Sequence, residues 1–124
     1  MQLKFNNRDP VYVQVVRHFK EQLASGILSA GQEIPSRREL AKKLKINPNT
    51  AQRAYKEMEE EGLIYTERNL PSKITKDVNK INAVREELLM EAVCTFVRAV
   101  KPINISIDEL VQLVTEKFKE EIEK

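Results

Sequence analysis

The sequence contains no tryptophan, one cysteine and three glycines, and it has no long uninterrupted apolar run. A single cysteine, Cys94, excludes an internal disulfide, and the single histidine, His18, leaves too few ligands for a zinc site. The apolar stretch at residues 88–100 is broken by Glu91 and Arg98, so it cannot span a bilayer. No apolar signal segment opens the chain, and we expect a cytoplasmic protein without metal, cofactor or membrane contact.

Residues for enzymatic chemistry are also missing. The sequence shows no carboxylate pair in an apolar setting, no nucleophile with a base, and no glycine-rich loop that could cradle a phosphate. We therefore expect that the protein is not an enzyme. Its 124 residues are 32% charged and 41% hydrophobic, which is the composition of a folded domain with a modest core.

The charges are unevenly distributed along the chain. Residues 1–76 hold 14 lysines and arginines against 9 acidic residues, whereas residues 77–124 hold 7 against 10. Residues 37–56 contain seven basic residues and one acid, Glu39. An ordinary solvated helix face mixes the two signs, so this local excess indicates a surface that meets phosphates.

Three helices are expected in the first half of the chain. Apolar residues recur at helical spacing after Pro10. Ser36 and Glu39 form a capping box at the start of a second, short helix, and Asn47 followed by Pro48 starts a third. The turn between the second and third helices is three or four residues long, so the pair is a helix-turn-helix.

A hairpin is expected after the third helix. Apolar residues between Leu63 and Ile74 predict two short strands around a turn at residues 69–72. A hairpin in this place is the wing of a winged helix. The expected fold is therefore mainly α, with a winged helix-turn-helix domain at residues 1–76.

The third helix presents two different sides on a helical wheel. The apolar side is expected to pack on the first two helices and consists of Ala51, Ala54, Tyr55 and Met58. The polar side and its flanks consist of Asn49, Thr50, Gln52, Arg53 and Lys56. Arginine can grip guanine, and asparagine or glutamine can grip adenine, so the polar side predicts base recognition. The acidic residues at positions 57 and 59–61 would repel phosphates, and we expect them to point away from DNA.

Two more helices are expected at residues 77–124, separated by Pro102 and the capping box that starts at Ser106. Two helices of this size cannot bury their apolar faces between themselves alone. We expect them to dimerise through Leu88, Leu89, Val93, Phe96, Val97, Leu110, Val111, Val114 and Phe118. The alternative is that they fold back on the winged domain.

Five short motifs lie within residues 10–64. They are P-x-Y-x-Q at residues 10–14, A-S-G-x-L and G-x-x-I-P-S-x-R-x-L-A within residues 24–41, N-x-N-T-x-x-R-A at residues 47–54, and E-x-E-G-L-I at residues 59–64. Together they resemble the DNA-binding domain of the GntR family of bacterial transcription regulators. The short two-helix tail is similar to that of the YtrA subfamily.

This resemblance implies a homodimer that binds an inverted-repeat operator in double-stranded DNA, usually as a repressor and often beside transporter genes. By position in the motifs, Ser36 and Arg38 correspond to DNA contacts of the second helix. The third-helix positions that correspond to DNA contacts are Asn49, Thr50, Gln52 and Arg53. The family wing carries glycines that let it enter the minor groove, whereas "RNLPSKITK" has none.

The expected DNA-binding residues combine these motif positions with the nearby basic and capping residues: Ser36, Arg37, Arg38, Lys42, Lys43, Lys45, Asn47, Asn49, Thr50, Gln52, Arg53, Lys56, Arg68 and Lys73. The alternative is a winged-helix module that binds protein without specific DNA readout. The basic second and third helices favour DNA. No polar cluster in the tail indicates a small-molecule effector.

Overall fold

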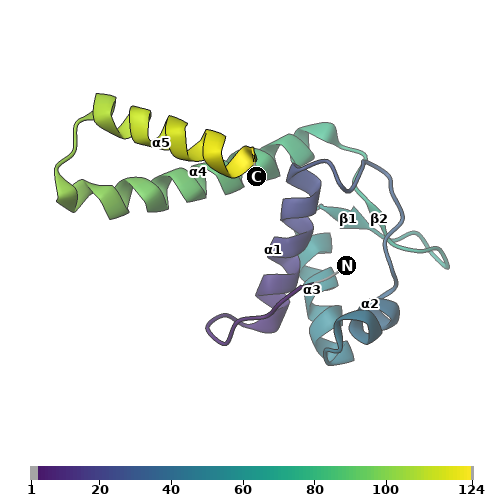
Figure 1. Ribbon diagram of the computed structural model, residues 1–124. Helices are drawn as coiled ribbons and strands as arrows, with labels where there is room; N and C mark the ends of the chain where they lie inside the picture. The colour runs from purple at the N-terminus through teal and green to yellow at the C-terminus, as the bar shows by residue number, and fades with distance from the viewer. Residues whose placement is uncertain (1–2, 124) are drawn as a thin grey trace. The chain divides into compact units, whose positions relative to one another are not determined.

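The computed structural model describes residues 3–123, and in these residues it has five α-helices and one two-stranded sheet (Figure 1). The chain divides into two compact units, one that extends to Leu88 and one that begins at Leu89. The division lies within α4 (Val78–Val100), whereas the sequence suggested a boundary before this helix.

Three helices form the body of the first unit, and α3 packs against both α1 and α2. Their bounds are Val11–Ala24 for α1, Arg37–Leu44 for α2 and Pro48–Glu60 for α3. The expected capping box begins α2: the Glu39 N–H donates to Ser36 Oγ at 3.1 Å, and the Ser36 N–H donates to the Glu39 carboxylate at 3.2 Å. These hydrogen bonds hold the pKa of Glu39 below its usual value.

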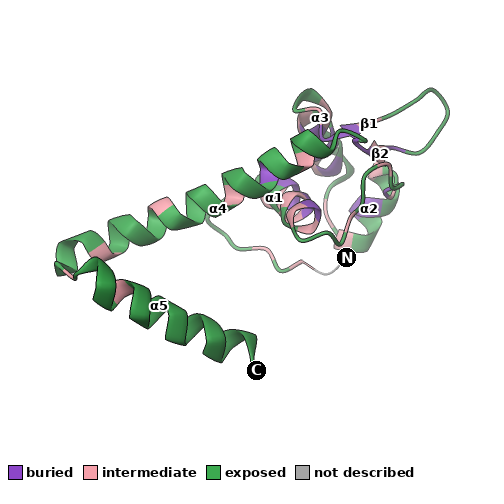
Figure 2. Cartoon of the chain, turned by 90° about the horizontal axis from the view of Figure 1, so that it is seen from above, coloured by how far each residue is buried: buried purple, intermediate pink, exposed green. Residues whose placement is uncertain are grey.

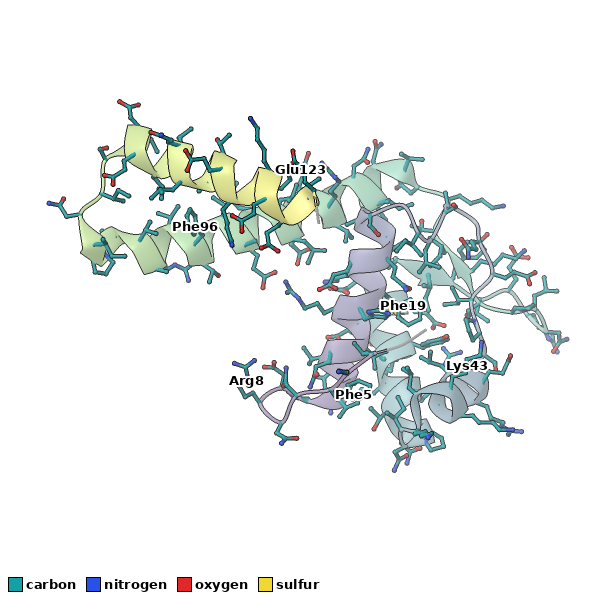
Figure 3. The ribbon with its side chains drawn as sticks, in the orientation of Figure 1. Phe5, Arg8, Phe19, Lys43, Phe96 and Glu123 are labelled. Atoms are coloured by element: carbon teal, nitrogen blue, oxygen red, sulfur yellow. The ribbon has the colours of Figure 1, made fainter. Side chains whose placement is uncertain are left out.

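The core of the first unit lies where α1 meets α3. Phe19 points from α1 towards α3 (Figure 3) and meets the Tyr55 ring edge to face, with the ring centroids 6.0 Å apart. Val84, from the first turns of α4, belongs to the same core and is 4% exposed. The start of α4 is therefore part of the winged domain, because its apolar side chains are buried there.

The expected wing is present as an antiparallel pair, β1 (Ile64–Tyr65) and β2 (Lys73–Ile74). Ile64 pairs with Ile74 in the register, which places both side chains in the core. At the neck of the wing the hydroxyls of Thr66 and Ser72 are hydrogen-bonded at 2.6 Å. The wing is therefore a short hairpin whose base is fixed by the core.

The second unit consists of the remainder of α4, a 3-10 turn at Lys101–Ile103 and α5 (Ile107–Ile122). The Ser106 hydroxyl caps α5 by accepting the Glu109 N–H. No residue of α5 is buried, as Figure 2 shows. Within residues 3–123 no helix is long and apolar enough to cross a membrane, and no cluster of acidic, cysteine or histidine side chains could hold a metal ion.

Candidate DNA-binding surface

The recognition surface begins at the turn between α2 and α3. Lys45 ends α2 in the left-handed conformation, with φ of 56°. Asn47 then caps α3, because its side-chain oxygen accepts the Asn49 N–H at 2.8 Å, and Pro48 occupies the first helical position. This cap uses the Asn47 oxygen within the protein, so Asn47 positions α3.

Four of the expected DNA-binding side chains line one shallow hollow of about 550 Å³ on the outer face of α3. They are Asn49, Gln52, Arg53 and Lys56, and all four are exposed. Thr50 is half-buried beside them. The hollow brings together arginine, amide and lysine side chains, which are the donors and acceptors that base edges and phosphates require.

The acidic end of α3 differs from what the sequence suggested. Glu57 and Glu60 line the same hollow as Arg53, so they do not point away from it. The reason is helical spacing: residues four and seven positions after Arg53 return to its face. Two carboxylates there would repel phosphates, so a DNA backbone would meet less repulsion at the first turns of α3.

The other two acidic residues of this run hold α3 to the rest of the first unit. Glu59 forms an ion pair with Arg37 at 2.7 Å, and Glu61 forms one with Lys20 at 3.4 Å. Lys20 also approaches Glu87 of α4 at 3.7 Å. These contacts tie α3 to α2, to α1 and to the first turns of α4.

Arg37 occupies a packing position. Its guanidinium lies 5.1 Å from the centre of the Tyr55 ring, its side chain is 29% exposed, and one of its nitrogens pairs with Glu59. The neighbouring Arg38 is exposed, as are Lys42 and Lys43 on the same helix. Three basic side chains of α2 are therefore free to meet phosphates, while Arg37 joins α2 to α3.

The two expected wing contacts lie in different settings. Arg68 is exposed in the turn of the hairpin, which contains Asn69 with φ of 63°. Lys73 is half-buried and pairs with Tyr65 across the two strands. Arg68 is thus the more accessible of the two for a phosphate.

One member of the surface was not expected from the sequence. Tyr12, from the first turn of α1, lines the same hollow as the α3 residues, and the Arg53 guanidinium lies 3.9 Å from the centre of its ring. The only signal for Tyr12 in the sequence is its place in the P-x-Y-x-Q motif. The contact itself depends on how closely α1 packs beside α3, which no local pattern reports.

A second surface lies on the tail helices. The expected dimerisation residues Leu89, Val93, Phe96, Val97, Val111, Val114 and Phe118 are all exposed. Leu110 is half-buried, and Leu88 packs instead against the core of the first unit. Phe96 and Phe118 line an apolar hollow of about 610 Å³, to which Leu113, a residue not expected there, also contributes.

Comparison with known proteins identifies the class of protein that carries these surfaces. The family described as "Bacterial regulatory proteins, gntR family" matches residues 11–73, which include α1, α2, α3 and the wing as far as the start of β2.

The chain belongs to the GntR family.

Relatives of known name cover more of the chain than the winged domain. The GntR chain is 30% identical over 112 residues to the HTH-type transcriptional regulator YhcF of Bacillus subtilis, covering 90% of the chain and 93% of YhcF. It is 35% identical over 94 residues to the HTH-type transcriptional repressor YtrA of the same organism, covering 71% of the chain and 72% of YtrA.

A solved structure agrees with these relatives. A GntR family transcriptional regulator from Listeria monocytogenes superposes with a TM-score of 0.85 at 31% identity, covering 90% of the chain and 98% of that protein. The chain is thus a GntR transcriptional regulator of the YtrA subfamily with a winged DNA-binding domain, and it is not an enzyme.

Proposed function

We propose that this GntR chain is a homodimeric repressor that recognises an inverted-repeat operator through α3. The observation that carries the proposal is the hollow on α3, where Asn49, Gln52 and Arg53 are exposed together beside the basic residues of α2. The related protein YtrA is named as a repressor, which supports repression rather than activation. As the resemblance to this subfamily implies, the regulated genes include those of a transporter.

The proposal assigns affinity to phosphate contacts and sequence selection to base contacts. The lysines Lys42, Lys43 and Lys56 meet phosphates and supply affinity that falls with salt. Arg53 reads guanine, and the amides of Asn49 and Gln52 read adenine. Exposed Arg68 adds a phosphate contact from the wing.

The apolar tail supports dimerisation. Within the second unit, no Cα atom of residues 89–100 of α4 lies within 8 Å of a Cα atom of α5, whereas packed helices have axes about 8–10 Å apart. The two helices diverge from their turn in Figure 2, and their apolar side chains remain exposed. A second copy of the chain offers the same apolar faces, and mutual burial would remove them from water. An inverted repeat is the DNA counterpart of such twofold symmetry.

Two substitutions test the division between base and phosphate contacts. Arg53→Ala should weaken binding to the operator by about 1–3 kcal/mol and change binding to random DNA little. Lys42→Ala should weaken both alike and lower the slope of log affinity against log salt by about one. The measurement is fluorescence anisotropy with DNA from upstream of the chain's own gene and a scrambled duplex, at two salt concentrations. Equal losses on both duplexes for Arg53→Ala would refute its role in base reading.

A further inference from the structure

Arg53 does not extend freely from α3. Its guanidinium carbon lies 3.9 Å from the centre of the Tyr12 ring, which is the distance of a close stack. The other residues that line this hollow all come from α3, so Tyr12 is the one side chain that α1 contributes to it within the described residues.

The Tyr12 ring is itself held in place. Tyr12 lies three and four residues before Val15 and Val16, which are buried in the core, so it shares their face of α1. It is half-buried and packs against the core from the edge. A ring supported in this way is a fixed platform, whereas the long Arg53 side chain alone would sample many rotamers.

Stacking fixes the guanidinium without using its hydrogen bonds. The face of the ring attracts the cation through its quadrupole, and this attraction uses none of the five N–H donors of the guanidinium. The edge of Arg53 that would contact guanine therefore remains available. The entropy lost when Arg53 becomes ordered has then been lost before DNA arrives.

We propose that Tyr12 is a positioning residue for base recognition, which holds the Arg53 guanidinium ready for a guanine. The inference rests on the proposed function, in which Arg53 reads a base. Operator preference then depends on α1 as well as on the recognition helix. Tyr12 acts through Arg53, so it contributes little to binding of DNA that lacks the preferred base.

The test compares Tyr12→Phe, which keeps the ring, with Tyr12→Leu, which keeps apolar bulk but removes the ring. Each is made in the full chain with and without Arg53→Ala, and binding to operator and scrambled duplex is measured at several salt concentrations. Tyr12→Phe should bind both as the unmodified chain does. Tyr12→Leu should lose about two- to fivefold on the operator alone, the factor that a partly exposed cation–π contact contributes. In the Arg53→Ala background it should lose nothing more.

Several outcomes would overturn the proposal. An equal loss on both duplexes in Tyr12→Phe, with an unchanged salt slope because the hydroxyl is uncharged, would make the hydroxyl a phosphate contact instead. If Tyr12→Leu leaves the operator preference unchanged, Tyr12 does not position Arg53. The same conclusion follows if Tyr12→Leu weakens operator binding as much in the Arg53→Ala background as it does in the unmodified chain. An unmodified chain without preference for the operator would overturn the proposed function itself, and this inference with it.

A second measurement does not depend on DNA. Stacking under an aromatic ring shifts the NMR signals of the Arg53 side chain upfield. The free protein and Tyr12→Phe should both show this shift, and Tyr12→Leu should not. Arg53 signals at ordinary positions in the unmodified chain would show that the stack does not form in solution.

Discussion

At the scale of single residues, Tyr55 connects three parts of the winged domain. It is fully buried, its hydroxyl donates a hydrogen bond to the Pro35 carbonyl, and its ring meets Phe19 of α1 and the Arg37 guanidinium of α2. Burial raises the pKa of Tyr55, because a phenolate in the core would lose its hydration, and the positive charge of Arg37 only partly opposes this effect.

The raised pKa predicts a loss of stability in alkali. Above about pH 10, the ordinary pKa of tyrosine, the unfolded chain releases the phenol proton while the folded protein retains it. The free energy of unfolding should therefore fall as the pH rises through this range. Urea unfolding measured at a series of pH values from about 8 to about 11 would show the decline.

Tyr55→Phe is the matched control, because it keeps the ring and cannot ionise. It should lose about 1 kcal/mol at neutral pH, since the Pro35 carbonyl loses its donor, and its stability should decline less steeply above pH 10 than that of the unmodified chain. Identical alkaline declines in the two proteins would mean that another group is responsible.

At the scale of the elements, the turn between α2 and α3 contains backbone strain. Lys45 adopts a positive φ of 56°, a conformation in which the Cβ of an ordinary residue crowds the following carbonyl. Its N–H still closes α2 by donating to the Ala41 carbonyl, so the conformation is needed to redirect the chain into α3. A lysine at this position adopts an unfavourable backbone conformation and places a positive charge near the proposed DNA.

Lys45→Gly should therefore raise the free energy of unfolding by up to about 1 kcal/mol while it weakens DNA binding. Lys42→Ala is the control: it removes the same charge from a regular helical position and should change stability by less than about 0.5 kcal/mol. Thermal unfolding and the salt dependence of anisotropy measure the two effects. Destabilisation by Lys45→Gly would show that the lost side-chain contacts outweigh the backbone strain.

Local signals predicted the elements well. The Ser36 capping box, the Pro48 helix start and the hairpin turn could be predicted because each depends on residues a few positions apart. Contacts between elements could not be predicted from the sequence. The stack of Tyr12 on Arg53 depends on how α1 packs beside α3. The sequence around either residue does not indicate that the other lies beside it.

The end of the winged domain, predicted at residue 76, depends on contacts of the same kind. The apolar pattern of α4 runs unchanged through the helix, although Val84 packs into the core of the first unit and Val93 is exposed in the second. Periodicity reports which face of a helix is apolar, and it does not report what covers that face.

At the scale of the whole molecule, the described residues of the second unit, 89–123, form no core of their own. Phe118 is 65% exposed and α5 buries no residue, so this unit leaves an apolar surface larger than isolated exposed side chains produce. The surface follows one side of α5, and Gln112 lies on the opposite side.

Phe118→Glu should convert the proposed dimer into a monomer, because the charge would have to be buried against apolar residues of the second copy. Gln112→Glu adds the same charge to the opposite side of α5 and should leave the dimer intact. Sedimentation velocity over a range of protein concentrations distinguishes the two. A Phe118→Glu protein that still sediments as a dimer would place the interface elsewhere.

The recognition helix is held at its start by the Asn47 cap, along its length by the pair of Arg37 with Glu59, and at its end by Lys20. These contacts favour a single shape for the proposed reading surface, so we expect it to adapt little to an irregular double helix. Adaptation at the interface then falls to the DNA, whose stiffness and groove width depend on its sequence. If α3 reads an operator as proposed, base pairs that no side chain touches should contribute to selectivity through the ease with which they bend.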